Sequence, residues 1–209
     1  MPGGPMDVDY FAVSNETKKI AERLSEAKVA SVRSRAGTEI TFGLSGRPGQ
    51  VDDGLYREKG RWGNLPSGEA YAVPVEETAE GQLIVEAGWA RDLRTPLTLT
   101  FRKGYVVDVK GGDKVGDQVR EILQLGRNEP PYTLRRNLAE LGVGTNPNAK
   151  NVSNLVEAEK IKGTVHLAIG DNAHMGGRVT VDYHRDFVIP RATLILDGDP
   201  ILQDGKLLI

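Results

Sequence analysis

The sequence has no cysteine among its 209 residues, and only 6% of them are aromatic. Without thiols there is no disulfide framework, no thiolate metal site and no cysteine nucleophile. No apolar run reaches the roughly 20 residues that a membrane-spanning helix needs, and the first residues lack the features of a signal peptide. The formal net charge is only -2, so nothing points to nucleic acid or an anionic membrane as a partner. We therefore predict a cytoplasmic protein.

The spacing of apolar residues predicts an α+β fold, an antiparallel-rich mixed sheet with two or three helices. Residues 1–10 are rich in Gly and Pro and are expected to be a linker or tail. Residues 11–209 are expected to form a single metal-binding catalytic domain. The first helix is predicted to begin at Ser14 or Asn15, either of which is a suitable N-cap.

Strands are expected wherever apolar and polar residues alternate with period two. This pattern predicts strands at 28–34, 38–44, 82–89, 97–101, 105–109, 164–169, 178–184, 192–196, 201–202 and 206–209. Residues 45–63 are predicted to be a loop, and residues 134–141 a short helix or strand that ends at Gly142. The basic pair Arg135-Arg136 is expected on an exposed helix face rather than in a phosphate site.

Histidine is rare and clustered: His166, His174 and His184 are the three in the chain, and all fall between Glu140 and Asp186. Each lies near a carboxylate or a glycine-rich turn, which is typical of a metal site. With cysteine absent, His, Asp, Glu and Tyr are the side chains left to hold a metal. The expected site lies at strand ends and in glycine-rich loops.

The His184-Arg-Asp186 segment is the most compact part of the predicted site. Residues two apart on a strand project from the same face, so the imidazole and the carboxylate are expected side by side. Pairing with the strand that carries His166 brings in a second imidazole, and two histidines with one carboxylate suffice for a divalent metal. The alternative is that His166 is a core residue and that His184 and Asp186 occupy an exposed strand end.

Glu69 and Glu140 are further candidates, because each borders a glycine-rich segment whose backbone can approach a ligand closely. The alternative is a surface charge at Glu69 and a helix-end residue at Glu140. The pairs Glu159-Lys160 and Asp171-Asn172 are candidates for hydrogen-bond partners of the histidines or for solvated charges. His174 lies in a loop, where it is a candidate ligand, proton shuttle or substrate contact.

Four segments, taken together and in order, resemble the thermophilic metallo-aminopeptidases of the aminopeptidase T and aminopeptidase S type. The resemblance covers the chain from about residue 8 to its end and rests on residues 63–69, 139–147, 159–170 and 184–186.

The resemblance implies two metal ions, zinc or cobalt, held by two Glu, two His, an Asp and a Tyr. By motif, the ligands are Glu69, Glu140, His166, His184 and Asp186, with Glu69 and Glu140 also as catalytic residues. It further implies a homodimer and a peptide or small-molecule substrate.

Two features depart from that family. Its tyrosine ligand lies seven residues after the first histidine, where this chain has Ala173; His174 and Tyr183 are the candidates to replace it. The family also carries an N-terminal domain before the metal-binding domain, and this chain is expected to be a fragment or relative that lacks it.

The leading hypothesis is a metallo-aminopeptidase that removes N-terminal residues from peptides with a water activated by two metals. The alternative is a ring-opening dioxygenase of the same fold, which also includes iron-dependent enzymes that open dihydroxypyridine rings. In that case His166, His184 and Asp186 form the 2-His-1-carboxylate set of a single iron(II). A third hypothesis is a domain that has kept the fold and lost the chemistry.

Overall fold

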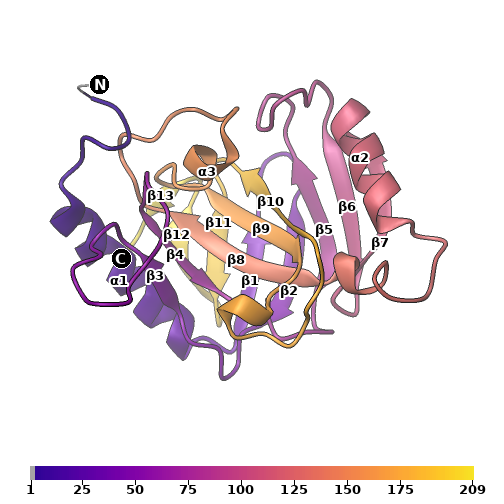
Figure 1. The fold of residues 1–209 in the computed structure, drawn as a ribbon, viewed down its shortest axis with the longest axis horizontal. Helices are drawn as coiled ribbons and strands as arrows, with labels where there is room; N and C mark the ends of the chain where they lie inside the picture. The colour runs from indigo at the N-terminus through magenta and orange to yellow at the C-terminus, as the bar shows by residue number, and fades with distance from the viewer. Residues whose placement is uncertain (1–2) are drawn as a thin grey trace.

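A computed structural model describes residues 3–209; residues 1–2 of the expected N-terminal tail lie outside the described residues. The chain folds into two antiparallel sheets that face each other, with helices at the edges (Figure 1). The helices are α1 (Tyr10–Glu26), α2 (Asp113–Leu123), α3 (Leu155–Ala158) and the short 3-10 turns η1 (Leu134–Arg136) and η2 (Ala173–Met175). The predicted α+β, antiparallel-rich fold is confirmed.

The larger sheet has the strand order β13-β12-β11-β1-β2-β5-β6-β7, and the smaller one the order β10-β9-β8-β4-β3. The first comprises β1 (Val29–Arg33), β2 (Glu39–Gly43), β5 (Glu80–Val85), β6 (Leu97–Arg102), β7 (Tyr105–Gly111), β11 (Thr193–Leu196), β12 (Asp199–Gln203) and β13 (Lys206–Leu207). The second comprises β3 (Gln50–Asp52), β4 (Glu69–Ala72), β8 (Leu138–Gly144), β9 (Val165–Gly170) and β10 (His184–Ile189).

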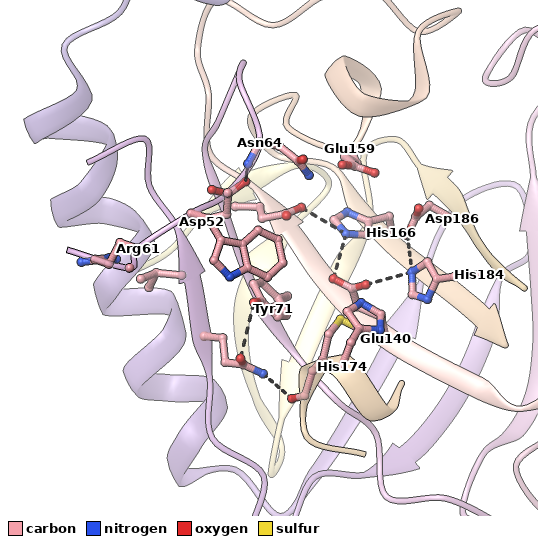
Figure 2. Close-up of a pocket in the computed structure, with 17 residues that line it drawn as sticks. Asp52, Arg61, Asn64, Tyr71, Glu140, Glu159, His166, His174, His184 and Asp186 are labelled. Carbon is pink, nitrogen blue, oxygen red and sulfur yellow. Dashed lines mark hydrogen bonds and ion pairs between the residues drawn. The ribbon is translucent and has the colours of Figure 1, made fainter. Parts of the chain in front are cut away.

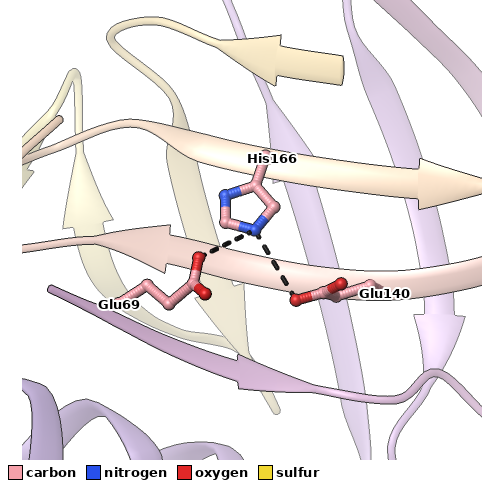
Figure 3. Close-up of side chains that lie close together, drawn as sticks. All are labelled: Glu69, Glu140 and His166. Carbon is pink, nitrogen blue, oxygen red and sulfur yellow. Dashed lines mark ion pairs between the residues drawn. The ribbon is translucent and has the colours of Figure 1, made fainter. Parts of the chain in front are cut away.

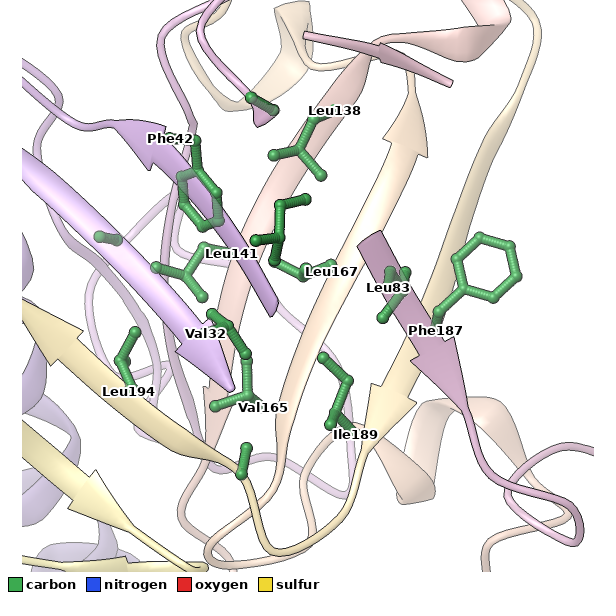
Figure 4. Packing of buried hydrophobic residues seen from close by; sticks show 14 of the residues in the cluster. Val32, Phe42, Leu83, Leu138, Leu141, Val165, Leu167, Phe187, Ile189 and Leu194 are labelled. Carbon is green, nitrogen blue, oxygen red and sulfur yellow. The ribbon is translucent and has the colours of Figure 1, made fainter. Parts of the chain in front are cut away.

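The hydrophobic core lies between the two sheets (Figure 4). Phe42 and Leu83 reach it from the larger sheet, and Leu141 and Leu167 from the smaller one. On β8 and β9 the residues that alternate with these core positions face away from the core, yet both strands are buried along their whole length. The outer face of the smaller sheet is therefore covered as well, and this is where polar residues collect.

Several local predictions were wrong. Asp9, not Ser14 or Asn15, caps α1, because its carboxylate accepts hydrogen bonds from the backbone N–H groups of residues 11 and 12. The predicted loop 45–63 contains strand β3, which is too short to show alternation. Residues 134–141 hold a 3-10 turn followed by β8, which runs through Gly142 to Gly144.

The predicted strand 178–184 is also wrong except at its last residue, His184. Side chains replace the strand ladder here: the backbone N–H of Val179 donates to Asn172 Oδ1, and that of Val181 donates to Asp171 Oδ1. Asp and Asn side chains commonly compete with regular structure in this way. The outcome is a loop, residues 171–183, that lies beside the end of β10.

The expected exposed face for Arg135-Arg136 was wrong for Arg136, which is buried. Its guanidinium donates to the carbonyl oxygens of Leu123 and Gln124 at 3.2 and 2.6 Å. These carbonyls end α2, where a cation complements the helix dipole. Within residues 3–209 no helix is long and apolar enough to cross a membrane.

Candidate metal centre and its pocket

The outer face of the smaller sheet brings together all five predicted ligands: Glu69 from β4, Glu140 from β8, His166 from β9, and His184 and Asp186 from β10. The antiparallel register explains their meeting, because Glu140 and Asp186 both lie opposite Ala168 of the strand between them. His184 and Asp186, two residues apart on one strand, project from the same face.

Glu140 lies between the two imidazoles (Figure 2). One of its carboxylate oxygens is 3.7 Å from His166 Nε2, and the other is 3.3 Å from His184 Nε2. His184 Nε2 also lies 3.6 Å from Asp186 Oδ1. The structure thus forms two groups of possible ligands that share one glutamate, Glu69–Glu140–His166 and Glu140–His184–Asp186, each with donor atoms within 4.8 Å of one another.

Glu69 faces His166 from the opposite side, with Oε2 3.3 Å from Nε2 (Figure 3). The space for this imidazole is provided by Gly142, its direct partner in the β8–β9 register. A Cβ atom at position 142 would lie 2.0 Å from His166 Nε2. The glycine therefore lets the imidazole lie flat over the neighbouring strand.

A buried lysine stands behind the predicted ligands. Lys160 Nζ lies 2.5 Å from Glu69 Oε1, 2.8 Å from Glu159 Oε1 and 3.7 Å from Asp52 Oδ2. Lys160 is fully buried, so the Glu159-Lys160 pair is not a solvated surface pair but part of the site. Asp52 was missed from the sequence, because the strand of three residues that carries it gives no pattern.

In the protein without metal, the neighbouring carboxylates raise the pKa values of His166 and His184. Burial alone lowers the pKa of His166, but Glu140 and Glu69 raise it to about 9. Burial likewise opposes the charge on His184, but Asp186 and Glu140 raise its pKa to about 11. Burial raises the pKa of Glu140, yet the two neighbouring imidazoles outweigh it and hold the pKa below its usual range. The cluster thus favours a positive charge between its carboxylates.

The two candidates to replace the missing tyrosine lie in different places. His174, in η2, lines the pocket and contacts His184 edge-on, with ring centroids 5.6 Å apart. Its Nδ1 is 2.5 Å from Asp171 Oδ2. Tyr183 instead packs against the core, and its buried hydroxyl has no hydrogen-bond partner within the described chain.

The residues present fit a divalent cation. Their donors are imidazole nitrogens and carboxylate oxygens, which suit Zn, Fe and Mn. One buried polar atom of the cluster, Glu69 Oε2, has no hydrogen-bond partner among residues 3–209, and buried polar atoms are seldom left unpaired without a reason. A cation between the carboxylates would also replace the protons that the imidazoles otherwise take up.

A pocket of about 440 Å³ opens over the cluster. Its walls come from the segment Gly60–Asn64, from Gln50 and Tyr71, and from His174 and Met175, with the predicted ligands at its base (Figure 2). This volume falls within the range of small-molecule sites.

Comparison with known proteins relates the chain to a family of dioxygenases. The family model of NicX, 2,5-dihydroxypyridine 5,6-dioxygenase, matches residues 11–209. The 2,5-dihydroxypyridine 5,6-dioxygenase of Pseudomonas putida KT2440 is 25% identical over 196 residues, which are 87% of this chain and 55% of that protein.

Two solved structures share the fold. The structure of the P. putida KT2440 dioxygenase superposes with a TM-score of 0.82 at 22% identity, covering 98% of this chain and 61% of that one. Wild-type AmpT from Thermus thermophilus gives a TM-score of 0.72 at 20% identity, covering 96% and 55%. The chain therefore spans little more than half the length of these relatives.

These comparisons overturn the predicted aminopeptidase. The resemblance to aminopeptidases T and S, and with it the assignment as a peptide hydrolase with two zinc or cobalt ions, was wrong, because the matching family is one of dioxygenases. The motifs misled because AmpT shares the fold. At 20% identity that likeness shows the fold alone.

Proposed function

The chain belongs to the NicX, 2,5-dihydroxypyridine 5,6-dioxygenase, family, and on this premise we propose that it is a dioxygenase that opens the ring of a small hydroxylated aromatic substrate. The observation that carries the proposal is that His166, His184 and Asp186 line one small-molecule pocket, in two ligand groups joined by Glu140. We assign residues 11–209, the range that the family model matches, to a single catalytic domain.

We assign one iron(II) ion to this cluster, held by His166, His184 and Asp186, the 2-His-1-carboxylate set of non-haem iron oxygenases. A bound ferrous ion would supply the one-electron chemistry with dioxygen that amino-acid side chains lack. Glu140, whose carboxylate lies within 3.7 Å of both imidazole Nε2 atoms, would share the ion with the two histidines. Glu69 faces His166 from the other side and is held there by Lys160.

The groups above the metal bind and orient the substrate. His174 Nδ1 is engaged by Asp171, which leaves Nε2 as the ring nitrogen free to take a proton from a substrate hydroxyl. The carboxylate partner fixes the orientation of the ring, as in other base–orienter pairs. Tyr71 and Met175 form part of the wall of this pocket.

The test is oxygen consumption by protein loaded anaerobically with iron(II), with 2,5-dihydroxypyridine as the substrate and elemental analysis alongside. We expect one iron per chain and uptake of oxygen together with loss of the aromatic absorbance. Asp186→Asn should lose iron and activity. Asp182→Asn is the matched control, because Asp182 is exposed and pairs with Arg135 at the surface.

Retention of iron and oxygen uptake by Asp186→Asn would show that the metal lies elsewhere. Absence of oxygen uptake by the iron-loaded wild type with this substrate would contradict the proposed reaction.

A further inference from the structure

Trp62 is the most exposed large apolar side chain of the described chain, with 82% of its surface accessible. It belongs to the segment 53–68 between β3 and β4, called here the pocket loop, and it lines the pocket over the metal cluster. An indole that contacts no core contributes nothing to packing within the chain. Its flat apolar face is instead open to the pocket that it lines.

The pocket loop is tied down on the side of Trp62 that leads to β4. The Tyr56 hydroxyl donates a short hydrogen bond to the Asp52 carboxylate and lies 2.8 Å from the Asn64 carbonyl oxygen. The backbone N–H of Asn64 donates to the same carboxylate at 3.3 Å. Gly63 packs so closely that a Cβ there would lie 2.4 Å from Asp52 Oδ1. These contacts hold the backbone next to Trp62 at the pocket wall.

Another wall of the pocket is fixed as well. Gln50 Nε2 donates to the carbonyl of Met175 at 2.8 Å, and the hydroxyl of Tyr71 donates to Gln50 Oε1 at 3.4 Å. The pocket therefore has a second wall, formed by Tyr71 and Met175 and held by hydrogen bonds, in addition to Trp62. The charged candidate ligands lie at its base. Flat aromatic groups in walls above a polar base match a planar ring that carries polar substituents at its metal-facing edge.

We propose that Trp62 is a substrate-binding residue that stacks on the aromatic ring and makes the site selective for planar rings over non-aromatic metal ligands. The proposal rests on the proposed function, because it names how that site recognises its substrate. Stacked aromatic pairs add affinity beyond the area they bury. A chelator without a ring meets the same metal but gains nothing from the indole.

The experiment compares two probes on the iron(II)-loaded protein under anaerobic conditions, by calorimetric titration. 2,5-Dihydroxypyridine is the planar probe, and acetohydroxamate is the non-aromatic metal ligand. Trp62→Ala should bind the planar probe roughly tenfold more weakly and bind acetohydroxamate as the wild type does. Trp62→Phe should recover most of the affinity. Leu65→Ala is the control, because Leu65 is an exposed apolar residue of the same loop outside the pocket lining.

Equal affinity of Trp62→Ala and wild type for the planar probe would overturn the inference. Equal weakening of both probes would overturn it too, because it would indicate a general disturbance of the pocket. Wild-type protein that binds the planar probe without consuming oxygen would refute the proposed reaction while the comparison of variants still tests the stacking. A wild type that binds no dihydroxypyridine would refute both.

Discussion

Gly142→Ala is the change that most directly tests how the fold places His166, a proposed metal ligand. The added methyl would lie 2.0 Å from Nε2 and 2.1 Å from Cε1 of His166. Ordinary van der Waals contact begins near 3.4 Å, so the imidazole must move by about 1.4 Å. It has little room, because it is 1% exposed and its strand is paired on both sides.

Two opposing effects set the stability of this variant. Alanine restricts the unfolded chain and so stabilises the fold by up to about 1 kcal/mol. Overpacking of a buried site costs about 1–3 kcal/mol, and the steric effect wins. We expect a net destabilisation of about 1–2 kcal/mol, and a loss of metal affinity of roughly 10- to 100-fold because the ligand is displaced.

The assay is urea unfolding of the metal-free protein together with a chelator competition for iron(II) affinity. Gly126→Ala is the matched control, since a Cβ at Gly126 meets nothing within 4 Å. An unchanged metal affinity for Gly142→Ala would refute the view that the glycine positions His166. Equal effects of the two substitutions would refute it as well.

Two further predictions concern the charges of the site. Lys160→Met should destabilise the protein by about 3–5 kcal/mol in urea unfolding, because it leaves buried carboxylates without their cation. The control Lys162→Met removes an exposed ion pair with Glu16 and should cost at most about 1 kcal/mol. Similar losses of stability in the two variants would contradict this prediction. The pKa values of His166 and His184 in the metal-free fold, about 9 and about 11, exceed the ordinary 6.5, so their contribution to stability is complete below about pH 6.5 and is lost as the pH rises through both values. Urea unfolding from pH 6 to 10 should show this decline without metal and a weaker one with it, and a rise in stability over that range without metal would refute the reasoning.

The sequence predicted those parts of the fold whose secondary structure depends on the local pattern of apolar residues alone. Strands such as β1 and β6 alternate cleanly between buried and more exposed residues. The pair His184 and Asp186 met on one face because a strand has period two. Where side chains from distant segments replace backbone partners, as Asn172 does for Val179, alternation predicted a strand that does not form.

The remainder of the site depends on tertiary contacts that leave no local pattern. Lys160 and Asp52 lie more than a hundred residues apart in the chain and meet only because loops close over the outer face of the smaller sheet. Glu140 lay in a region predicted as helix or strand, and its place between two imidazoles follows from the β8–β9–β10 register. The reaction class was wrong for a related reason, since the motifs that carry the ligands accompany a fold that AmpT shares with the dioxygenase.

The charges at the base of the pocket explain why the site would bind protons on its histidines without metal and a divalent cation when metal is present. The carboxylates of Asp52, Glu69, Glu140, Glu159 and Asp186 line the pocket, and the one ammonium beside them, that of Lys160, pairs with Asp52, Glu69 and Glu159. Four negative charges are therefore uncompensated when the carboxylates are ionised and both imidazoles are neutral. Two protons on the imidazoles or one divalent ion remove the same two charges. Protons and metal therefore compete for the same imidazoles, so metal affinity should rise with pH.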